Sequence, residues 1–138
     1  MKKFTCFTLS LLILLTSVVG LAACSSSEGT SESAEDSIRA YADPATETTL
    51  QGLSEDDLAK YTKYANDEFK AALTSEILSA TSTQINDQLG TFQSIEFLST
   101  GEQEGYTIVH YRATYSKGDV GVRMVFDKDH KVAGQWFE

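Results

Sequence analysis

The stretch Tyr106-Thr107-Ile108-Val109-His110-Tyr111-Arg112-Ala113-Thr114-Tyr115 decides the fold class of this chain. Apolar and small side chains occupy every second position, namely Thr107, Val109, Tyr111, Ala113 and Tyr115. The positions between them include His110, Arg112 and Thr114. Because successive side chains of a strand point to opposite faces of a sheet, this period of two predicts a strand with one apolar and one mixed face.

Similar patterns occur on both sides of this stretch. We expect strands at residues 92–99, 106–116, 120–127 and 131–137, with turn residues at 101–105, 118–119 and 128–130. In the third strand Val120, Val122, Met124 and Phe126 share the apolar face. Short connections between consecutive strands favour an antiparallel meander.

The turn between the second and third strands predicts a register. If Gly118-Asp119 forms a two-residue loop, four pairs lie opposite each other: Tyr115 and Val122, Ala113 and Met124, Tyr111 and Phe126, and His110 and Asp127. A slip by two residues would place Arg112 opposite Arg123, and two like charges in that position are unfavourable. We therefore prefer the first register.

Residues 43–90 have a helical period. Asp43-Pro44 is typical of an N-cap followed by a first helical residue, and this helix is expected to run to Gly52. Ser54 is expected to cap a helix whose apolar face is Leu58, Tyr61, Ala65, Phe69 and Leu73, either continuous or broken at Asn66-Asp67. Thr74 begins another helix, and Gly90 ends it. The prediction is an α+β domain, with N-terminal helices packed on a curved four-stranded antiparallel meander.

The first 23 residues have the three-part layout of a secretory signal peptide. Lys2 and Lys3 precede an apolar run at residues 7–19, and Ala22 and Ala23 follow it. The run is close to the lower length limit of a membrane-spanning helix, so a single-pass anchor is the alternative. Residues 25–37 are rich in Ser and Glu, which predicts a flexible tether at 24–37 before a single domain at 38–138.

The segment Leu21-Ala22-Ala23-Cys24 resembles the lipobox of bacterial lipoproteins. The resemblance implies cleavage between Ala23 and Cys24, a diacylglyceryl thioether on Cys24 and at least one further acyl chain such as palmitate. Two or more chains hold a protein stably on a bilayer. The expected location is the extracytoplasmic face of a bacterial membrane. Ser25 is compatible with a Gram-negative or a Gram-positive cell.

Composition excludes several kinds of function. The formal net charge is −9, and loss of Lys2 and Lys3 would make it more negative, so nucleic acid is not an expected partner. Cys24 is the only cysteine after residue 23, because Cys6 lies in the signal peptide. A disulfide framework, a thiolate zinc site and a cysteine nucleophile are therefore excluded from the mature domain. We predict no cofactor and no metal.

Four polar residues are candidates for facing a ligand: His110, Arg112, Arg123 and Asp127. A carboxylate at Asp127 beside His110 could orient a general base, although a surface cross-strand pair is the more ordinary interpretation. Arg112 and Arg123 could bind an anion, or they could pair with carboxylates such as Glu96 or Glu102. The sequence assigns no catalytic residue.

Two further features have ordinary alternatives. The run Asp127-Lys128-Asp129-His130 hints at a cation site, but it lacks the glycine and terminal glutamate of an EF-hand loop, which favours a polar turn. The aromatic residues Tyr106, Tyr111, Tyr115, Phe126, Trp136 and Phe137 can line a pocket between sheet and helix, or they can form plain core. Trp136 is placed to cover the mouth of such a pocket or to plug it.

The stretch from Asp67 to Phe137 resembles the bacterial domain of unknown function 3887 family. The residues that carry the resemblance are Asp67-Glu68-Phe69, Leu73-Thr74, Leu89-Gly90, Phe92, Ser94-Ile95, residues 105–109, residues 122–127 and residues 131–134. They are core and turn positions, so the resemblance implies a fold, a nuclear transport factor 2-like or cystatin-like cone, and no catalytic residues. Members resemble secreted proteins or lipoproteins, some of them with an adjacent α/β-hydrolase.

Three functions are compatible with these patterns. The leading hypothesis is a non-enzymatic module of the cell envelope, anchored through Cys24, that binds a small ligand or a protein. The first alternative is a small isomerase- or dehydratase-type enzyme that uses the cone pocket with His110 and Asp127. The second is a structural or assembly partner of another envelope protein.

Overall fold

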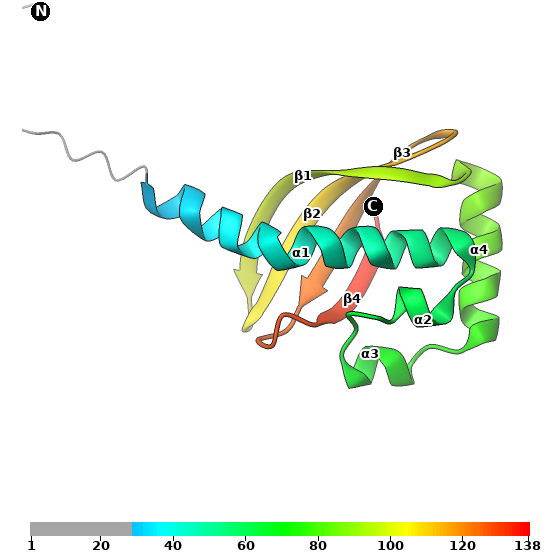
Figure 1. The fold of residues 1–138 in the computed structure, drawn as a ribbon, viewed down its shortest axis with the longest axis horizontal. Helices are drawn as coiled ribbons and strands as arrows, with labels where there is room; N and C mark the ends of the chain where they lie inside the picture. The colour runs from blue at the N-terminus through cyan, green and yellow to red at the C-terminus, as the bar shows by residue number, and fades with distance from the viewer. Residues whose placement is uncertain (1–28) are drawn as a thin grey trace, which may run out of the picture.

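The computed structural model describes residues 29–138 and consists of four helices followed by four strands (Figure 1). The helices are α1 (Gly29–Glu55), α2 (Leu58–Tyr61), α3 (Asp67–Ala71) and α4 (Ser75–Leu89). The strands are β1 (Phe92–Gln103), β2 (Tyr106–Tyr115), β3 (Gly118–Phe126) and β4 (Val132–Phe137). The predicted signal peptide, the cleavage site and Cys24 lie outside the described residues.

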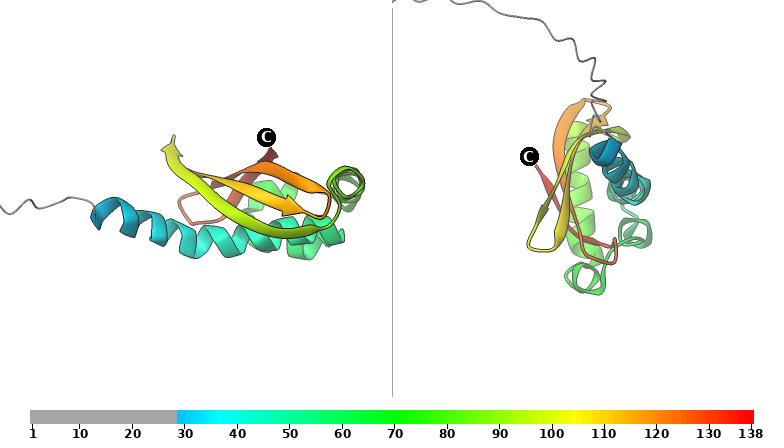
Figure 2. Two further views of the ribbon diagram at one scale, coloured as in Figure 1. Left: turned by 90° about the horizontal axis from the view of Figure 1, so that it is seen from above. Right: turned by 90° about the vertical axis from the view of Figure 1, so that its left-hand side faces the viewer.

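The strands form one antiparallel sheet in the order β1-β2-β3-β4, which confirms the predicted meander and the α+β class. The helices lie on one face of the sheet, and α4 crosses one end of it (Figure 2). We call the opposite face the uncovered face. The cone-type assignment stays a prediction.

The predicted register between β2 and β3 is wrong by four residues. Tyr111 lies opposite Val122, and His110 lies opposite Arg123. The loop consists of Ser116 and Lys117, whereas Gly118 already belongs to β3. A register shift by an even number of residues keeps every side chain on its face of the sheet. The predicted apolar face is therefore correct, although the predicted cross-strand partners are not.

Contacts with the end of α4 explain the position of this loop. The N–H of Ser116 donates to the carbonyl of Thr91, and the N–H of Lys117 donates to the carbonyl of Leu89. Lys117 Nζ also lies 3.0 Å from the carbonyl oxygen of Asp87, in the last turn of α4. A cation there suits the negative end of a helix. Local turn propensity at Gly118-Asp119 does not outweigh these tertiary hydrogen bonds.

The helix predicted to start at Asp43-Pro44 begins earlier, because α1 runs without interruption from Gly29 and contains Pro44. A proline inside a helix removes one backbone hydrogen bond and costs about 3 kcal/mol. Burial on both sides of Pro44 offsets this cost, since Ala42, Ala45 and Leu50 are at most 1% exposed. Asp43 instead accepts a hydrogen bond of 2.8 Å from the hydroxyl of Tyr111.

Residues 29–37, which the sequence assigns to a flexible tether, are therefore helical. Ile38 is the first residue of α1 that packs against the hydrophobic core. Residues 33–37 are exposed or only half-buried. Once the packed part of α1 has nucleated the helix, each added residue gains a hydrogen bond without a new nucleation cost.

The later helix ends follow local chemistry. Asp57, not the predicted Ser54, caps α2 by accepting from the N–H of Lys60, and Asn66 caps α3. The chain therefore breaks at Asn66-Asp67, as one of the two predictions allowed. Thr74 caps α4, and Gly90 ends it with a φ of 82°, which confirms both predictions.

The core lies between α1 and the inner face of the sheet. Its buried residues are Ala42, Ala45, Leu50, Val109, Tyr111, Ala113, Tyr115, Val122, Met124, Phe126 and Val132. A second cluster of Leu53, Tyr61 and Leu78 joins the helices. Within residues 29–138 no helix combines the length and the apolar character needed to cross a membrane.

Candidate functional site

Three of the sequence-predicted residues lie on the uncovered face of the sheet. The registers of the three strand pairs place Ser99, His110, Arg123 and Trp136 in one row across the sheet. Arg112 lies on the same face, because it is two residues from His110 along β2. Asp127, the fourth residue, follows the end of β3 and lies outside this row.

Trp136 is the most exposed aromatic side chain described, at 46%. Its ring lies over Gly134, where a Cβ atom would come within 2.2 Å of Cη2 of the indole. The guanidinium carbon of Arg123 lies 4.8 Å from the ring centroid, a distance suited to a cation–π interaction. The missing side chain of Gly134 and the cation of Arg123 together hold a large aromatic ring in place on an open surface.

Glu138 links the neighbouring polar groups. One carboxylate oxygen lies 3.2 Å from Nδ1 of His110, and the other lies 3.5 Å from Nε of Arg123. The second distance is an ion-pair contact without hydrogen-bond geometry, since Nε of Arg123 has no hydrogen-bond partner. We call His110, Arg123, Trp136 and Glu138 the platform.

The hypothesis of a His110–Asp127 pair is wrong, because the actual register brings His110 to Arg123 and Glu138. Arg112 pairs with Glu96 at 2.7 Å, in agreement with the pairing alternative for this arginine. Both side chains are more than half exposed, so the pair contributes little to stability.

Asp127 organises the turn between β3 and β4. Its Oδ1 accepts hydrogen bonds from the N–H groups of Asp129 and Lys131, and its Oδ2 accepts one from Asn66. Partial burial alone would raise the pKa of Asp127, but these three hydrogen bonds lower it below its usual value. This is the polar turn that the sequence favoured over a cation site. Among residues 33–138 no three His, Cys, Asp or Glu side chains are arranged to hold a metal ion.

The other aromatic residues divide between core and surface. Tyr111, Tyr115 and Phe126 are buried in the core, whereas Tyr106 is 42% exposed. Burial and the neighbouring Asp43 raise the pKa of Tyr111. Trp136 neither covers nor plugs a pocket between sheet and helices, because Phe137, its neighbour, packs against the core and Trp136 points to the uncovered face.

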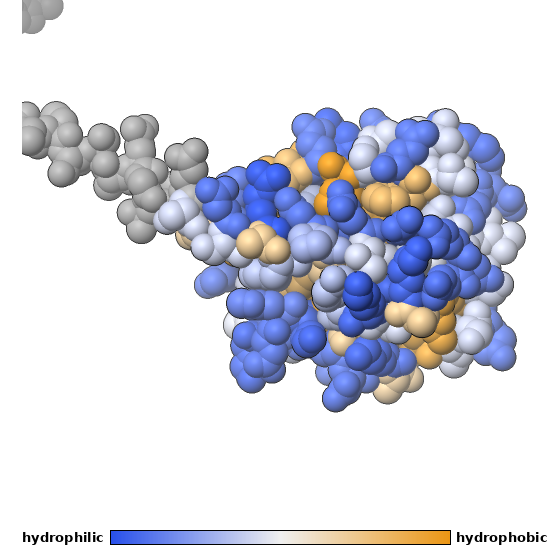
Figure 3. All heavy atoms as spheres, in the orientation of Figure 1, coloured by the Kyte–Doolittle hydropathy of each residue, from blue (hydrophilic) through white to orange (hydrophobic). Residues whose placement is uncertain are grey.

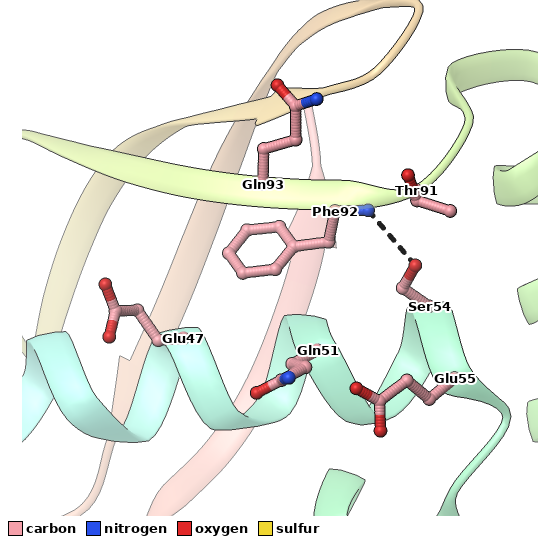
Figure 4. A pocket seen from close by; sticks show the side chains of 7 residues that line it. All are labelled: Glu47, Gln51, Ser54, Glu55, Thr91, Phe92 and Gln93. Carbon is pink, nitrogen blue, oxygen red and sulfur yellow. Dashed lines mark hydrogen bonds between the residues drawn. The ribbon is translucent and has the colours of Figure 1, made fainter.

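A second surface was not predicted from the sequence. Figure 4 shows a groove between the C-terminal half of α1 and the start of β1, with a volume of about 400 Å³. It is lined by Glu47, Gln51, Ser54, Glu55, Thr91, Phe92 and Gln93. We call it the α1–β1 groove. Glu47, Gln51 and Glu55 recur every four residues, a signal that becomes complete only once the helix is known to continue past its predicted end at Gly52.

The groove combines an aromatic floor with a polar rim. The ring of Phe92 lies between the two elements, and its N–H donates to Oγ of Ser54 at 3.1 Å (Figure 4). The hydrogen bond from Lys60 lowers the pKa of Glu55. Among the described side chains Glu47 forms no ion pair, so its charge is the one left uncompensated at this rim.

Comparison with known proteins gives a match to a protein family. The model of the family described as "Protein of unknown function (DUF3887)" matches residues 46–134, which include the C-terminal half of α1 and nearly all of the sheet. Neither the curated proteins nor the solved structures provide a match. The match includes the α1–β1 groove and, of the platform, His110 and Arg123, whereas Trp136 and Glu138 follow its end; it carries no assigned activity.

Proposed function

From the premise that the chain belongs to the DUF3887 family, we propose that it is a lipid-anchored binding protein of the bacterial cell envelope whose platform contacts a ligand or a partner protein. The observation that carries the proposal is Trp136, a large aromatic side chain held in place yet 46% exposed. Tryptophan and arginine are the residues most enriched among binding hot spots. A preorganised side chain loses little conformational entropy when it is bound.

The surroundings of Trp136 suit binding better than catalysis. Arg123 and His110 both contact the carboxylate of Glu138 on the open face of the sheet. The space beneath the sheet is filled by core side chains. The enzyme alternative required His110 beside Asp127 and an open cone, and neither arrangement is present among the described residues.

The anchor is supported by the lipobox-like segment that ends at Cys24. Labelling cells with a radioactive or clickable fatty acid tests it directly. We expect the parent chain to be labelled and processed, and Cys24→Ser to be neither labelled nor cut at this site. Equal labelling of the two chains would contradict the anchor.

Site-specific photo-crosslinking in cells tests the platform. A photoreactive amino acid at Ser99, which lies in the same row as His110, is expected to capture a discrete partner. The same amino acid at Gln84, exposed on α4, is the matched control. We expect Trp136→Ala to abolish the adduct at position 99. An adduct of equal yield at position 84, or one unaffected by Trp136→Ala, would overturn the proposal.

A further inference from the structure

We propose that the α1–β1 groove is a second binding site, which takes an extended peptide segment that carries a lysine or arginine next to an apolar side chain. The site is separate from the platform, because its residues come from α1 and the first residues of β1. The inference does not depend on the proposed anchor or on the platform.

The free edge of β1 supplies the backbone part of the argument. β1 is an outer strand of the sheet, paired only with β2, and its other edge is open to a further strand. The N–H of Phe92 already donates to Ser54 of α1, so an added segment would pair with the residues that follow Phe92. Bulges at Gln93 and Leu98 divide the regular pairing of β1 into Ser94–Phe97, next to the groove, and Ser99–Gln103. An added segment would therefore pair over only a few residues, as in other cases of strand addition.

The side chains of the groove supply the selectivity. At one end of this part of α1, Arg39 forms an ion pair with Asp43. At the other end, Lys60 forms one with Glu55. Glu47 lies between them without such a partner and is exposed. Figure 3 shows hydrophobic surface beside β1, above α1, framed by hydrophilic residues. In an extended peptide, residues i and i+2 share a face, so a cation and an apolar side chain at this spacing could both enter the groove, the cation at Glu47 and the apolar side chain against Phe92.

Binding of designed peptides to the full chain in detergent tests this site. The probes are two ten-residue peptides with threonine at every second position. The remaining positions alternate lysine and valine in one peptide, and glutamate and valine in the other. Binding is followed by amide NMR shifts at low salt. We expect the lysine peptide to perturb Gln93–Phe97 and the glutamate peptide to have no effect. Fluorescence of Trp136, the single tryptophan, is expected to stay unchanged.

Two matched variants sharpen the test. Glu47→Gln is expected to weaken binding of the lysine peptide by about 2- to 5-fold, the value of one exposed ion pair. Glu68→Gln, which removes an exposed carboxylate on α3, is expected to have no effect. Shifts centred on β4, equal binding of both peptides, or equal loss in the two variants would overturn the proposal. The fluorescence of Trp136 reports on the platform independently. A failure of the groove proposal is therefore distinguishable from a failure of the platform proposal.

Discussion

The two faces of the sheet differ in what holds their side chains. On the covered face Val109, Tyr111 and Met124 are fully buried between the strands and α1. On the uncovered face His110, Arg123 and Trp136 are held by contacts with one another and with Glu138, and all remain partly exposed. The covered face therefore accounts for stability, whereas the uncovered face can be altered with little effect on folding.

The largest expected effect is on the covered face. Phe126 is fully buried, and its ring lies 5.4 Å from that of Tyr41 in an edge-to-face arrangement. Phe126→Ala is expected to lower the free energy of unfolding by about 3–5 kcal/mol, through lost burial and the cavity left behind. Urea unfolding measures this. Ile77→Ala, at a residue that is 49% exposed, is the control and should change stability by less than about 0.5 kcal/mol.

The second prediction concerns the contact between α1 and α2. A Cβ atom at Gly52 would lie 2.4 Å from the backbone N of Tyr61, and the backbone cannot move aside as a side chain can. Gly52→Ala is expected to cost about 1–3 kcal/mol, despite the higher helix propensity of alanine. Thermal unfolding checks the loss. Gly118→Ala meets no atom within 4 Å and should leave the melting temperature unchanged.

An intermediate effect is expected at the end of β3. Asp127→Ala removes the acceptor of three hydrogen bonds and should destabilise the chain by about 1–2 kcal/mol at pH 7. Asp129→Ala is the control, because Asp129 forms only an exposed pair with Lys128 through its side chain.

The difference in stability between the parent chain and Asp127→Ala depends on pH in a defined way. The pKa of Asp127 is lowered in the folded chain, so its stabilisation is present above its unfolded pKa of about 3.9 and is lost as the pH falls through the folded value. Urea unfolding of the parent and Asp127→Ala should therefore give converging stabilities below about pH 4. A difference that persists or grows at lower pH would contradict this role.

The smallest effect on stability is expected on the uncovered face. Gly134→Ala places a Cβ atom against the indole of Trp136, which is a side chain and can swing away. We expect a loss below about 1 kcal/mol, together with a clear change in tryptophan fluorescence as the ring leaves Arg123. An unchanged emission spectrum would show that Gly134 does not position this ring.

Much of the fold was predictable from local patterns. The period of two in residues 106–115 predicted which side chains would be buried, because a strand presents alternate residues to each face. Thr74 and Gly90 marked the ends of α4, because an N-cap hydroxyl and a glycine with positive φ act over a few residues only. The four-strand order followed from short connections.

The candidate site was predictable only in part. His110, Arg112 and Arg123 were assigned to one face, but the partner of His110 was wrong by four residues. The groove was missed because the predicted helix ended at Gly52, which left out Glu55, and because no local pattern places Phe92 beside this helix.

The sequence by itself determined which side chains of β2 and β3 face the core, where α4 ends and how the strands follow one another, since these depend on neighbours within a few positions. The tertiary structure decided the register of β2 and β3, the continuity of α1 through Pro44 and the contacts of Trp136. Each of these depends on contacts between separate elements of the fold. The carbonyls of Leu89 and Thr91 hold the β2–β3 loop, and the sheet packs against α1. Arg123 of β3 holds the indole of Trp136. Burial and hydrogen bonds with distant segments outweigh a local preference of a few kcal/mol when their combined free energy is larger.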